Sequence, residues 1–207
     1  MGEAAQAGVG RNTSMKLVIL DRNGTINVHR EDFVKSDTEW TPLPGALEAV
    51  ARLNHAGWHV VIASNQSGLG RGLFDMASLN AMHAKMHKML AAVGGRVDAV
   101  FYCPHSPDED CECRKPKPGL FQQIGDRFGI DLAGVPTAGD SLRDLQAGAA
   151  AGCEPHLLLT GMGAACRGFD PLPPEYPADT RVHEDLAAFV DFLLAREARA
   201  ESMQVAL

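Results

Sequence analysis

Four consecutive aliphatic residues, Leu17 to Leu20, run directly into Asp21 in the stretch KLVILDRNGTIN at Lys16–Asn27. An unbroken aliphatic run of this length predicts a strand that is buried on both faces, as in a parallel sheet. The polar residues that follow then lie just beyond the carboxyl end of the strand, where open α/β sheets build their sites. The alternative is a strand that simply ends in a turn, since Asp, Asn and Gly are the usual turn residues.

The rest of the chain alternates short apolar runs with segments in which apolar residues recur at the spacing of a helix. Such alternation predicts parallel βαβ units in one doubly wound, Rossmann-like α/β sheet. We expect further strands at 58–63, 97–102, 135–138 and 154–159, and helices at 44–56, 75–92, 118–128, 142–151 and 185–199.

Length and composition narrow the class of protein. The 207 residues are enough for one domain, which we expect at 15–200, with a disordered N-terminal extension at 1–14 and a tail at 201–207. Residues 1–14 lack the pattern of a signal peptide, and no apolar run reaches the roughly 18 residues that a membrane helix needs. The net charge of -7 gives no support to nucleic-acid binding. We therefore expect a cytoplasmic protein that binds neither nucleic acid nor membrane, and a monomer would fit its small size.

Polar side chains follow three of the predicted strands. Asp21, the pair Ser64-Asn65, and Asp140 come directly after strands whose carboxyl ends share one edge of a parallel sheet, so they can converge. Aspartates from two strands can share a hard cation such as Mg²⁺, while Ser64 and Asn65 can donate to a phosphate oxygen. Lys115 adds a positive charge. This set suits phosphoryl transfer, in which catalysis is mostly positioning and charge neutralisation.

A second group of ligands lies in one loop. Cys103, His105, Cys111 and Cys113 offer three thiolates and one imidazole, a closed tetrahedral set for structural Zn²⁺. The alternative is a reduced loop without metal. We favour zinc because four soft ligands cluster in a chain that is otherwise poor in them, and we expect the ion to staple a loop that lacks secondary structure.

Two other groups of residues have simpler explanations. Cys153 and Cys166 stand apart and are expected to be ordinary thiols. His83 and His87 are four residues apart in a predicted helix, but no further ligand completes a metal site, so we expect an exposed helix face.

The ordered motifs Asp21–Thr25, Ser64-Asn65, Lys115, and Gly139-Asp140 with Asp144 resemble the haloacid dehalogenase superfamily of phosphatases. The resemblance implies that Asp21 attacks phosphorus and forms an aspartyl-phosphate. It also implies that Mg²⁺ binds Asp21, the backbone carbonyl of Asn23 and Asp140, and that Asp144 supports the groups around those ligands.

The chain departs from this pattern at Asn23, where these phosphatases have the aspartate that protonates the leaving group and then activates water. A carboxamide cannot give and take a proton at neutral pH. Because the metal ligand at this position is a main-chain oxygen, we expect Mg²⁺ binding to survive and turnover to be slow. Two origins of Asn23 are open, which are a natural divergence and an engineered substitution.

The Cys-rich loop narrows the resemblance. The run CPH…CEC followed by Arg114–Gly119 (RKPKPG) resembles the D-glycero-D-manno-heptose-1,7-bisphosphate 7-phosphatases and the related histidinol-phosphate phosphatases. About 38 residues separate Thr25 from Ser64, which indicates a minimal cap. The resemblance implies that substrate and phosphate are bound by Arg22, His29, Arg30, Glu31, Asp32, Ser64, Asn65, Gln66, Ser67, Arg71, Arg114 and Lys115.

The sequence therefore predicts a Mg²⁺-dependent phosphatase with a structural zinc. By the resemblance, it would remove the 7-phosphate of a heptose bisphosphate in heptose biosynthesis for the lipopolysaccharide core. Histidinol-phosphate phosphatase is the alternative within the class. A non-catalytic protein that binds sugar phosphates is the alternative from another class, and Asn23 is what favours it.

Overall fold

A computed structural model describes residues 15–205. Its centre is a parallel sheet of six strands in the order β3-β2-β1-β4-β5-β6. The doubly wound sheet predicted from the apolar runs is confirmed. The strands are β1 Leu17–Leu20, β2 His59–Asn65, β3 Ala99–Cys103, β4 Pro136–Gly139, β5 Glu154–Leu158 and β6 Arg181–His183.

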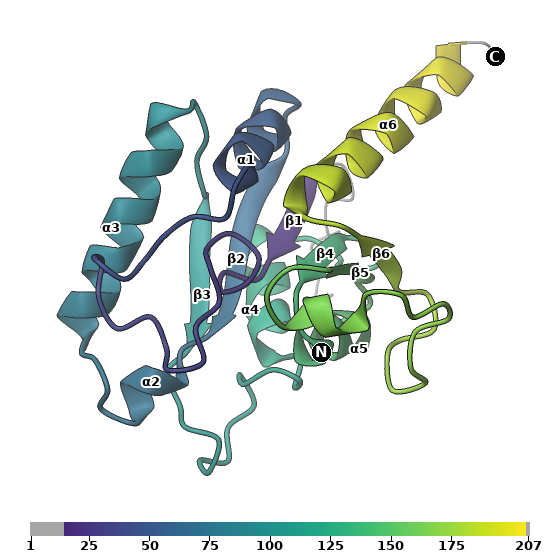
Figure 1. Ribbon diagram of the computed structural model, residues 1–207. Helices are drawn as coiled ribbons and strands as arrows, with labels where there is room; N and C mark the ends of the chain where they lie inside the picture. The colour runs from purple at the N-terminus through teal and green to yellow at the C-terminus, as the bar shows by residue number, and fades with distance from the viewer. Residues whose placement is uncertain (1–14, 206–207) are drawn as a thin grey trace, which may run out of the picture.

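Helices cover both faces of the sheet, as Figure 1 shows. They are α1 Ala46–His55, α2 Ser67–Gly70, α3 Met76–Ala92, α4 Gly119–Phe128, α5 Leu142–Ala150 and α6 Leu186–Val205, with a 3-10 turn, η1, at Gly161–Cys166.

The side chains of β1 explain the two layers. Val18 and Leu20 join one buried cluster with residues of α1, α3 and α6, whereas Leu17 and Ile19 join a second cluster with residues of α4 and α5. Successive residues of a strand point to opposite faces, so an aliphatic run buries both faces at once. All four side chains of β1 are at most 1% exposed.

The direction in which successive strands are added to the sheet reverses at β1. The order β1, β2, β3 proceeds toward one edge of the sheet, and β4, β5, β6 proceeds toward the other. The crevice beyond the carboxyl ends of β1 and β4 is therefore the topological switch point, the usual binding place in an open α/β sheet.

The segment between Asn27 and α1 has neither a helix nor a strand of its own. It is anchored by Val34 and Trp40, which are buried in the cluster on the α1 side of the sheet. The minimal cap expected from the short spacing is therefore an irregular loop that lies beside the switch point.

Some elements differ from the sequence expectation. Helix α6 continues to Val205, so residues 201–205, expected as a tail, are helical. The strand β6 and the short helices α2 and η1 were not expected. The expected disordered extension, residues 1–14, lies outside the described residues.

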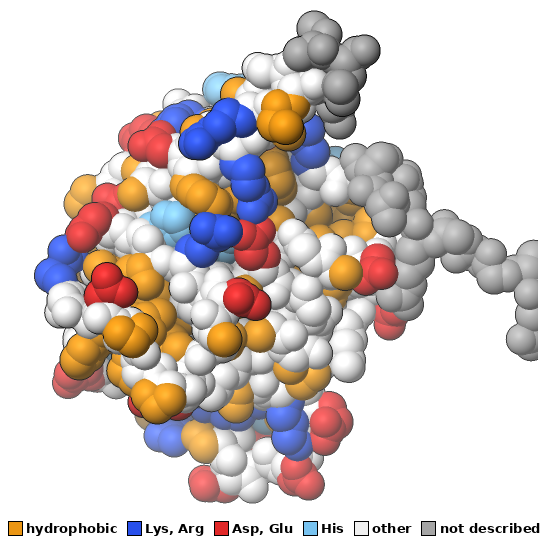
Figure 2. All heavy atoms as spheres, turned by 90° about the vertical axis from the view of Figure 1, so that its right-hand side faces the viewer, with side chains coloured by type: hydrophobic (Ala, Val, Ile, Leu, Met, Phe, Trp, Pro, Cys, Tyr) orange, Lys and Arg blue, Asp and Glu red, His pale blue; other side chains and the backbone are white. Residues whose placement is uncertain are grey.

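The described helices and one face of the surface bear on the expectations from composition. None of the described helices combines the length and apolar character that crossing a bilayer requires. On the face shown in Figure 2, basic and acidic side chains are interspersed.

Candidate active site and metal centres

Three carboxylates meet beyond the ends of β1 and β4; Asp21, Asp140 and Asp144 are called the acidic cluster below. All three are buried, and their ligand oxygens lie within 4.8 Å of one another. Asp21 directly follows β1, and its N–H donates to the carbonyl of Ala138 in β4 at 2.9 Å. Asp140 directly follows β4. The convergence predicted from the strand ends is what the structure shows.

Two glycines allow the backbone to approach Asp140 closely. A Cβ atom on Gly24 would lie 1.9 Å from Asp140 Oδ2, and one on Gly161 would lie 2.0 Å from the same oxygen. Both glycines have positive φ, which other residues rarely adopt. The N–H of Met162 donates to Asp140 Oδ2 at 2.8 Å, so the turn η1 also closes on the acidic cluster.

Lys115 brings a positive charge into the acidic cluster. Its Nζ lies 2.7 Å from Asp21 Oδ1 and 2.6 Å from Asp144 Oδ1, and the side chain is 2% exposed. The other oxygen of Asp144 accepts from the N–H and the hydroxyl of Ser141 at 3.0 and 2.7 Å. Asp144 is therefore bound on both oxygens, which agrees with a supporting role.

The charges of this site do not balance. Three carboxylates face one ammonium, which leaves two negative charges in excess. Burial, with Asp144 and Asp21 nearby, raises the pKa of Asp140 to about 8. Burial also raises the pKa of Asp21 against the opposing charge of Lys115. A divalent cation with a preference for oxygen ligands fits this donor set and this charge.

Asn65 fixes the position of Lys115. Its amide oxygen accepts from the Lys115 N–H at 3.1 Å, and its amide nitrogen donates to the Lys115 carbonyl at 3.0 Å. The ammonium of Lys115 also donates to the carbonyl of Ala63 in β2 at 2.6 Å. The end of β2 thus holds the lysine in place over the sheet edge.

A cleft of about 290 Å³ opens over the acidic cluster. Most of the residues expected to bind substrate line it. They are His29, Arg30, Glu31, Asn65, Ser67, Arg71, Arg114 and Lys115.

The other four expected contacts lie outside the lining. Asp32 is exposed and paired with Arg30 and Lys35. Ser64 and Gln66 are buried, and the Gln66 amide donates a hydrogen bond to the Ser64 hydroxyl at 2.8 Å. Arg22 is completely buried and points toward α3.

Sequence reasoning missed six of the residues that line the cleft, which are Phe33, Val34, Pro107, Ser141, Arg143 and Met162. Of these, Arg143 and Met162 bear most on the chemistry of the site. Arg143 was foreseeable, because it stands in the first turn of the helix that begins directly after Asp140, and this turn lies at the same sheet edge. No sequence signal pointed to Met162, which reaches the cleft only because η1 folds back toward Asp140.

The expectation for His83 was wrong. His83 is half-buried and its Nε2 lies 3.2 Å from Arg22 Nη1, so it is no part of an exposed helix face. His87, one turn further along α3, is exposed as expected. Cys153 and Cys166 are buried free thiols.

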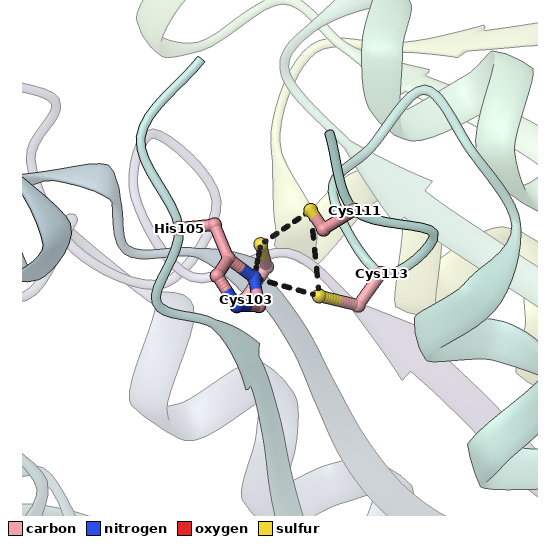
Figure 3. A group of neighbouring side chains, drawn as sticks. All are labelled: Cys103, His105, Cys111 and Cys113. Atoms are coloured by element: carbon pink, nitrogen blue, oxygen red, sulfur yellow. Dashed lines mark hydrogen bonds between the residues drawn. The ribbon is translucent and has the colours of Figure 1, made fainter. Parts of the chain in front are cut away.

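The thiol cluster, meaning Cys103, His105, Cys111 and Cys113, lies in and after the end of β3. Figure 3 shows the four side chains pointing toward one another. The sulfur of Cys111 lies 3.7 Å from that of Cys103 and 3.7 Å from that of Cys113. His105 Nδ1 lies 3.5 and 3.3 Å from the sulfurs of Cys103 and Cys113.

These distances can be compared with those of a zinc site. Tetrahedral zinc with bonds of about 2.3 Å to sulfur and about 2.0 Å to nitrogen places two sulfurs about 3.8 Å apart and a sulfur and a nitrogen about 3.5 Å apart. A disulfide would need about 2.05 Å between sulfurs. The thiol cluster therefore has the dimensions of a zinc site and could hold the ion.

Comparison with known proteins agrees with this geometry. The haloacid dehalogenase-like hydrolase family matches residues 16–152. A D-glycero-beta-D-manno-heptose-1,7-bisphosphate 7-phosphatase of Bordetella bronchiseptica is 58% identical over 180 residues, which are 87% of this chain and 98% of that protein. The enzyme of the same name from Pseudomonas aeruginosa is 48% identical over 181 residues, 87% of this chain and 99% of that protein.

Solved structures give the same result. The crystal structure of a D,D-heptose 1,7-bisphosphate phosphatase from B. bronchiseptica, complexed with magnesium and phosphate, has a TM-score of 0.82 and 57% identity, covering 88% of this chain and 99% of that one. The corresponding phosphatase from Burkholderia thailandensis has a TM-score of 0.65 and 54% identity, covering 86% of this chain and 98% of that one.

Proposed function

The chain belongs to the haloacid dehalogenase-like hydrolases, and from this premise we propose that it removes the 7-phosphate of D-glycero-beta-D-manno-heptose 1,7-bisphosphate. The observation that carries the proposal is the acidic cluster at the floor of the cleft, with Lys115 bound to it. This chain matches nearly the whole length of two relatives that are named as phosphatases of this substrate.

Asp21 is the nucleophile in this proposal. One carboxylate oxygen attacks phosphorus, the bond from phosphorus to the sugar oxygen breaks, and an aspartyl-phosphate forms on Asp21. Water then hydrolyses this intermediate and regenerates the carboxylate. Lys115 holds Asp21 in position and offsets the charge of the phosphoryl group.

Asp21, Asp140 and the backbone carbonyl of Asn23 would hold Mg²⁺. The ion supplies positive charge to the phosphoryl oxygens. Asp144 would remain bound to Lys115 and Ser141 rather than to the ion. The thiol cluster would hold Zn²⁺, which fixes the loop that carries Arg114 and Lys115.

Asn23 limits the rate in this proposal. The sugar oxygen leaves with a negative charge, and an amide can donate a hydrogen bond to it but cannot transfer a proton. Acid–base catalysis contributes about 10²- to 10⁴-fold, or about 3–5 kcal/mol. We therefore expect phosphate release that is slower by this factor than with aspartate at position 23.

Three arginines could bind the second phosphate. Arg71, Arg114 and Arg143 line the cleft, and within residues 15–205 none of them forms an ion pair with a carboxylate. Burial lowers the pKa of Arg114, and the nearby positive charges of Arg143 and Arg71 lower it further. A hollow of about 540 Å³ adjoins the cleft and shares Arg114 and Arg143 with it, so a bisphosphate has room to extend there.

The test is phosphate release from a panel of substrates by the chain and by its Asn23→Asp variant. The panel contains both anomers of the heptose bisphosphate, histidinol phosphate and fructose 1,6-bisphosphate. We expect the highest kcat/KM for the beta-anomer, and a rise of about 10² to 10⁴ in kcat for Asn23→Asp.

The outcomes separate the alternatives. Preference for histidinol phosphate would replace the substrate assignment. Tight binding of the bisphosphate without release of phosphate by either protein would show a sugar-phosphate-binding protein. Equal rates for the two proteins would contradict the role given to Asn23.

A heptose phosphatase acts on a soluble intermediate of lipopolysaccharide-core synthesis, so we place the enzyme in the cytoplasm, where it can act as a monomer.

A further inference from the structure

Arg22 is a buried cation whose guanidinium contacts no carboxylate among the described residues. Its side chain is 0% exposed. Nε and Nη2 donate to Asn23 Oδ1 at 3.3 and 3.2 Å, and Nη2 also donates to Gln66 Oε1 at 3.1 Å. Nη1 lies 3.2 Å from His83 Nε2. A buried charge is costly unless its donors are satisfied, so each of these neutral acceptors matters to the position of Arg22.

The contact with Arg22 fixes the tautomer of the His83 ring. A guanidinium can only donate, so Nε2 must accept and the ring proton must sit on Nδ1. Burial, together with the charges of Arg22 and His87, lowers the pKa of His83 to about 4, which keeps the ring neutral near pH 7.

The same network orients Asn23. Its Oδ1 accepts from Arg22 and also from Asn27 Nδ2 at 3.1 Å. The amide nitrogen has no hydrogen-bond partner within residues 15–205, and Asn23 lines the cleft. With the oxygen held by Arg22 and Asn27, the nitrogen is the end that is left for a ligand.

We propose that His83 is a positioning residue, which holds Arg22 and through it keeps the reactive end of residue 23 turned toward the substrate. Gln66 is held independently, because its amide donates to Ser64 Oγ at 2.8 Å. Nη1 of Arg22 has His83 as its one hydrogen-bond acceptor in the described part of the chain. The proposal rests on the proposed phosphatase function and adds a residue of α3, 61 positions away from Arg22, to its site.

The test uses the geometry of the contact. Glutamine places its amide near the position of histidine Nε2, whereas asparagine places it near Nδ1. We therefore compare His83→Gln, His83→Asn and His83→Ala, with His87→Ala as the matched control, since His87 is exposed on the same helix. The readouts are kcat and KM for phosphate release, and the side-chain NH₂ resonances of Asn23 in the NMR spectrum, assigned by their absence in Asn23→Asp.

We expect His83→Ala and His83→Asn to lower kcat about 10-fold, to change KM less than about 2-fold, and to shift the Asn23 resonances. His83→Gln should restore kcat and the resonances, and His87→Ala should change neither. Equal kcat and resonances in His83→Gln and His83→Asn would overturn the proposal, and so would an equal loss of kcat in both with the resonances unmoved.

If His83→Ala fails to fold, which its melting curve would show, the pair of Gln and Asn variants decides alone. If neither the chain nor Asn23→Asp releases phosphate from any substrate, the proposed function fails. The Asn23 resonances in the His83 variants then still decide whether His83 orients residue 23.

Discussion

The acidic cluster and the thiol cluster are both shaped for a metal ion, but they are held in opposite ways. Asp21 and Asp140 follow directly from two neighbouring strands, and Asp144 stands in the first turn of α5. In the thiol cluster, Cys103 ends β3, while the other three ligands lie in a segment without helix or strand.

The difference shows what a metal would do at each place. In the acidic cluster the sheet and Lys115 fix the carboxylates, so an ion relieves excess charge without being needed for the geometry. In the thiol cluster the side-chain hydrogen bonds run among the four residues themselves, so an ion would supply much of the geometry. The fold therefore forms the acidic cluster without an ion, whereas an ion in the thiol cluster would help to form the fold.

The largest expected effect separates activity from stability. In the Asn23→Asp background, Asp21→Asn should lower phosphate release at least about 10⁴-fold, because it removes the nucleophile. The melting temperature should fall little or rise, since one of three mutually repelling carboxylates is removed. Parallel kinetics and thermal melts check this. A melting temperature lowered as much as by loss of the thiol cluster would show that the two clusters contribute equally to stability.

Loss of zinc should instead act on stability. An ion present at 1,000 times its Kd stabilises by about 4 kcal/mol, which corresponds to about 8–16 °C in a chain of this size. Cys103→Ser should lose zinc and lower the melting temperature by this amount in zinc-containing buffer. Metal analysis and melting curves measure it, with Cys153→Ser as a control that keeps zinc. Unchanged zinc content in Cys103→Ser would show that the thiol cluster does not hold the ion.

Lys115 follows the thiol cluster by two residues along the chain, and its side chain enters the acidic cluster, so its removal should affect the acidic cluster. Lys115→Met leaves the buried carboxylates of Asp21 and Asp144 without their cationic partner. Breaking a buried ion pair costs about 3–5 kcal/mol, and we expect the low end because the carboxyls can take up protons. Unfolding in urea checks the loss. Added Mg²⁺ should recover part of it, and no recovery would argue against a cation at the acidic cluster.

Asn65 offers a smaller perturbation of the same lysine. Asn65→Ala removes two hydrogen bonds to the Lys115 backbone, each worth about 1 kcal/mol. We expect a loss of about 2 kcal/mol in unfolding free energy together with a lower kcat, measured by urea unfolding and steady-state kinetics. Ser67→Ala, at a cleft residue without this contact, should cost less stability.

The smallest effect is a dependence on pH in the metal-free protein. The pKa of Asp140 is raised from 3.8 to about 8 by burial and by its neighbours Asp144 and Asp21. Between these values the folded state binds more protons than the unfolded state, so stability falls as pH rises, by at most about 1.4 kcal/mol per pH unit. Melts at pH 6 and pH 7 with a chelator should show a drop of a few degrees, and Mg²⁺ should abolish it. A rise instead would contradict the excess of negative charge.

The sequence predicted those parts of the site that depend on strand ends. The run Leu17–Leu20 has to be buried on both faces, which makes the strand parallel and central and places Asp21 at the switch point. Asp140 follows β4, which is also buried along its whole length, and the carboxyl ends of parallel strands share one edge, so the meeting of Asp21 and Asp140 was predictable. The thiol cluster was predictable from ligand chemistry alone, because its members are close in the chain.

The parts that were not predicted depend on contacts between distant segments. His83 looks like a surface residue in its own helix, and only the packing of α3 beside the first loop brings it to Arg22. Strand β6 has three residues, two of them exposed, and so lacks an apolar run. Helix α6 continues past the residues that its core contacts require, into a stretch that is exposed on all sides through Met203.

Three consecutive residues take part in three different parts of the site. Cys113 belongs to the thiol cluster, Arg114 lines the cleft, and Lys115 enters the acidic cluster. The length of this tripeptide is therefore as constrained as its composition, because inserting or deleting one residue would move all three groups out of step. The neighbouring segment 107–110 is exposed but is constrained as well, because Pro107 lines the cleft and all four residues line the hollow beside it. An epitope tag or a fluorescent label inserted there would therefore disturb the wall of the site.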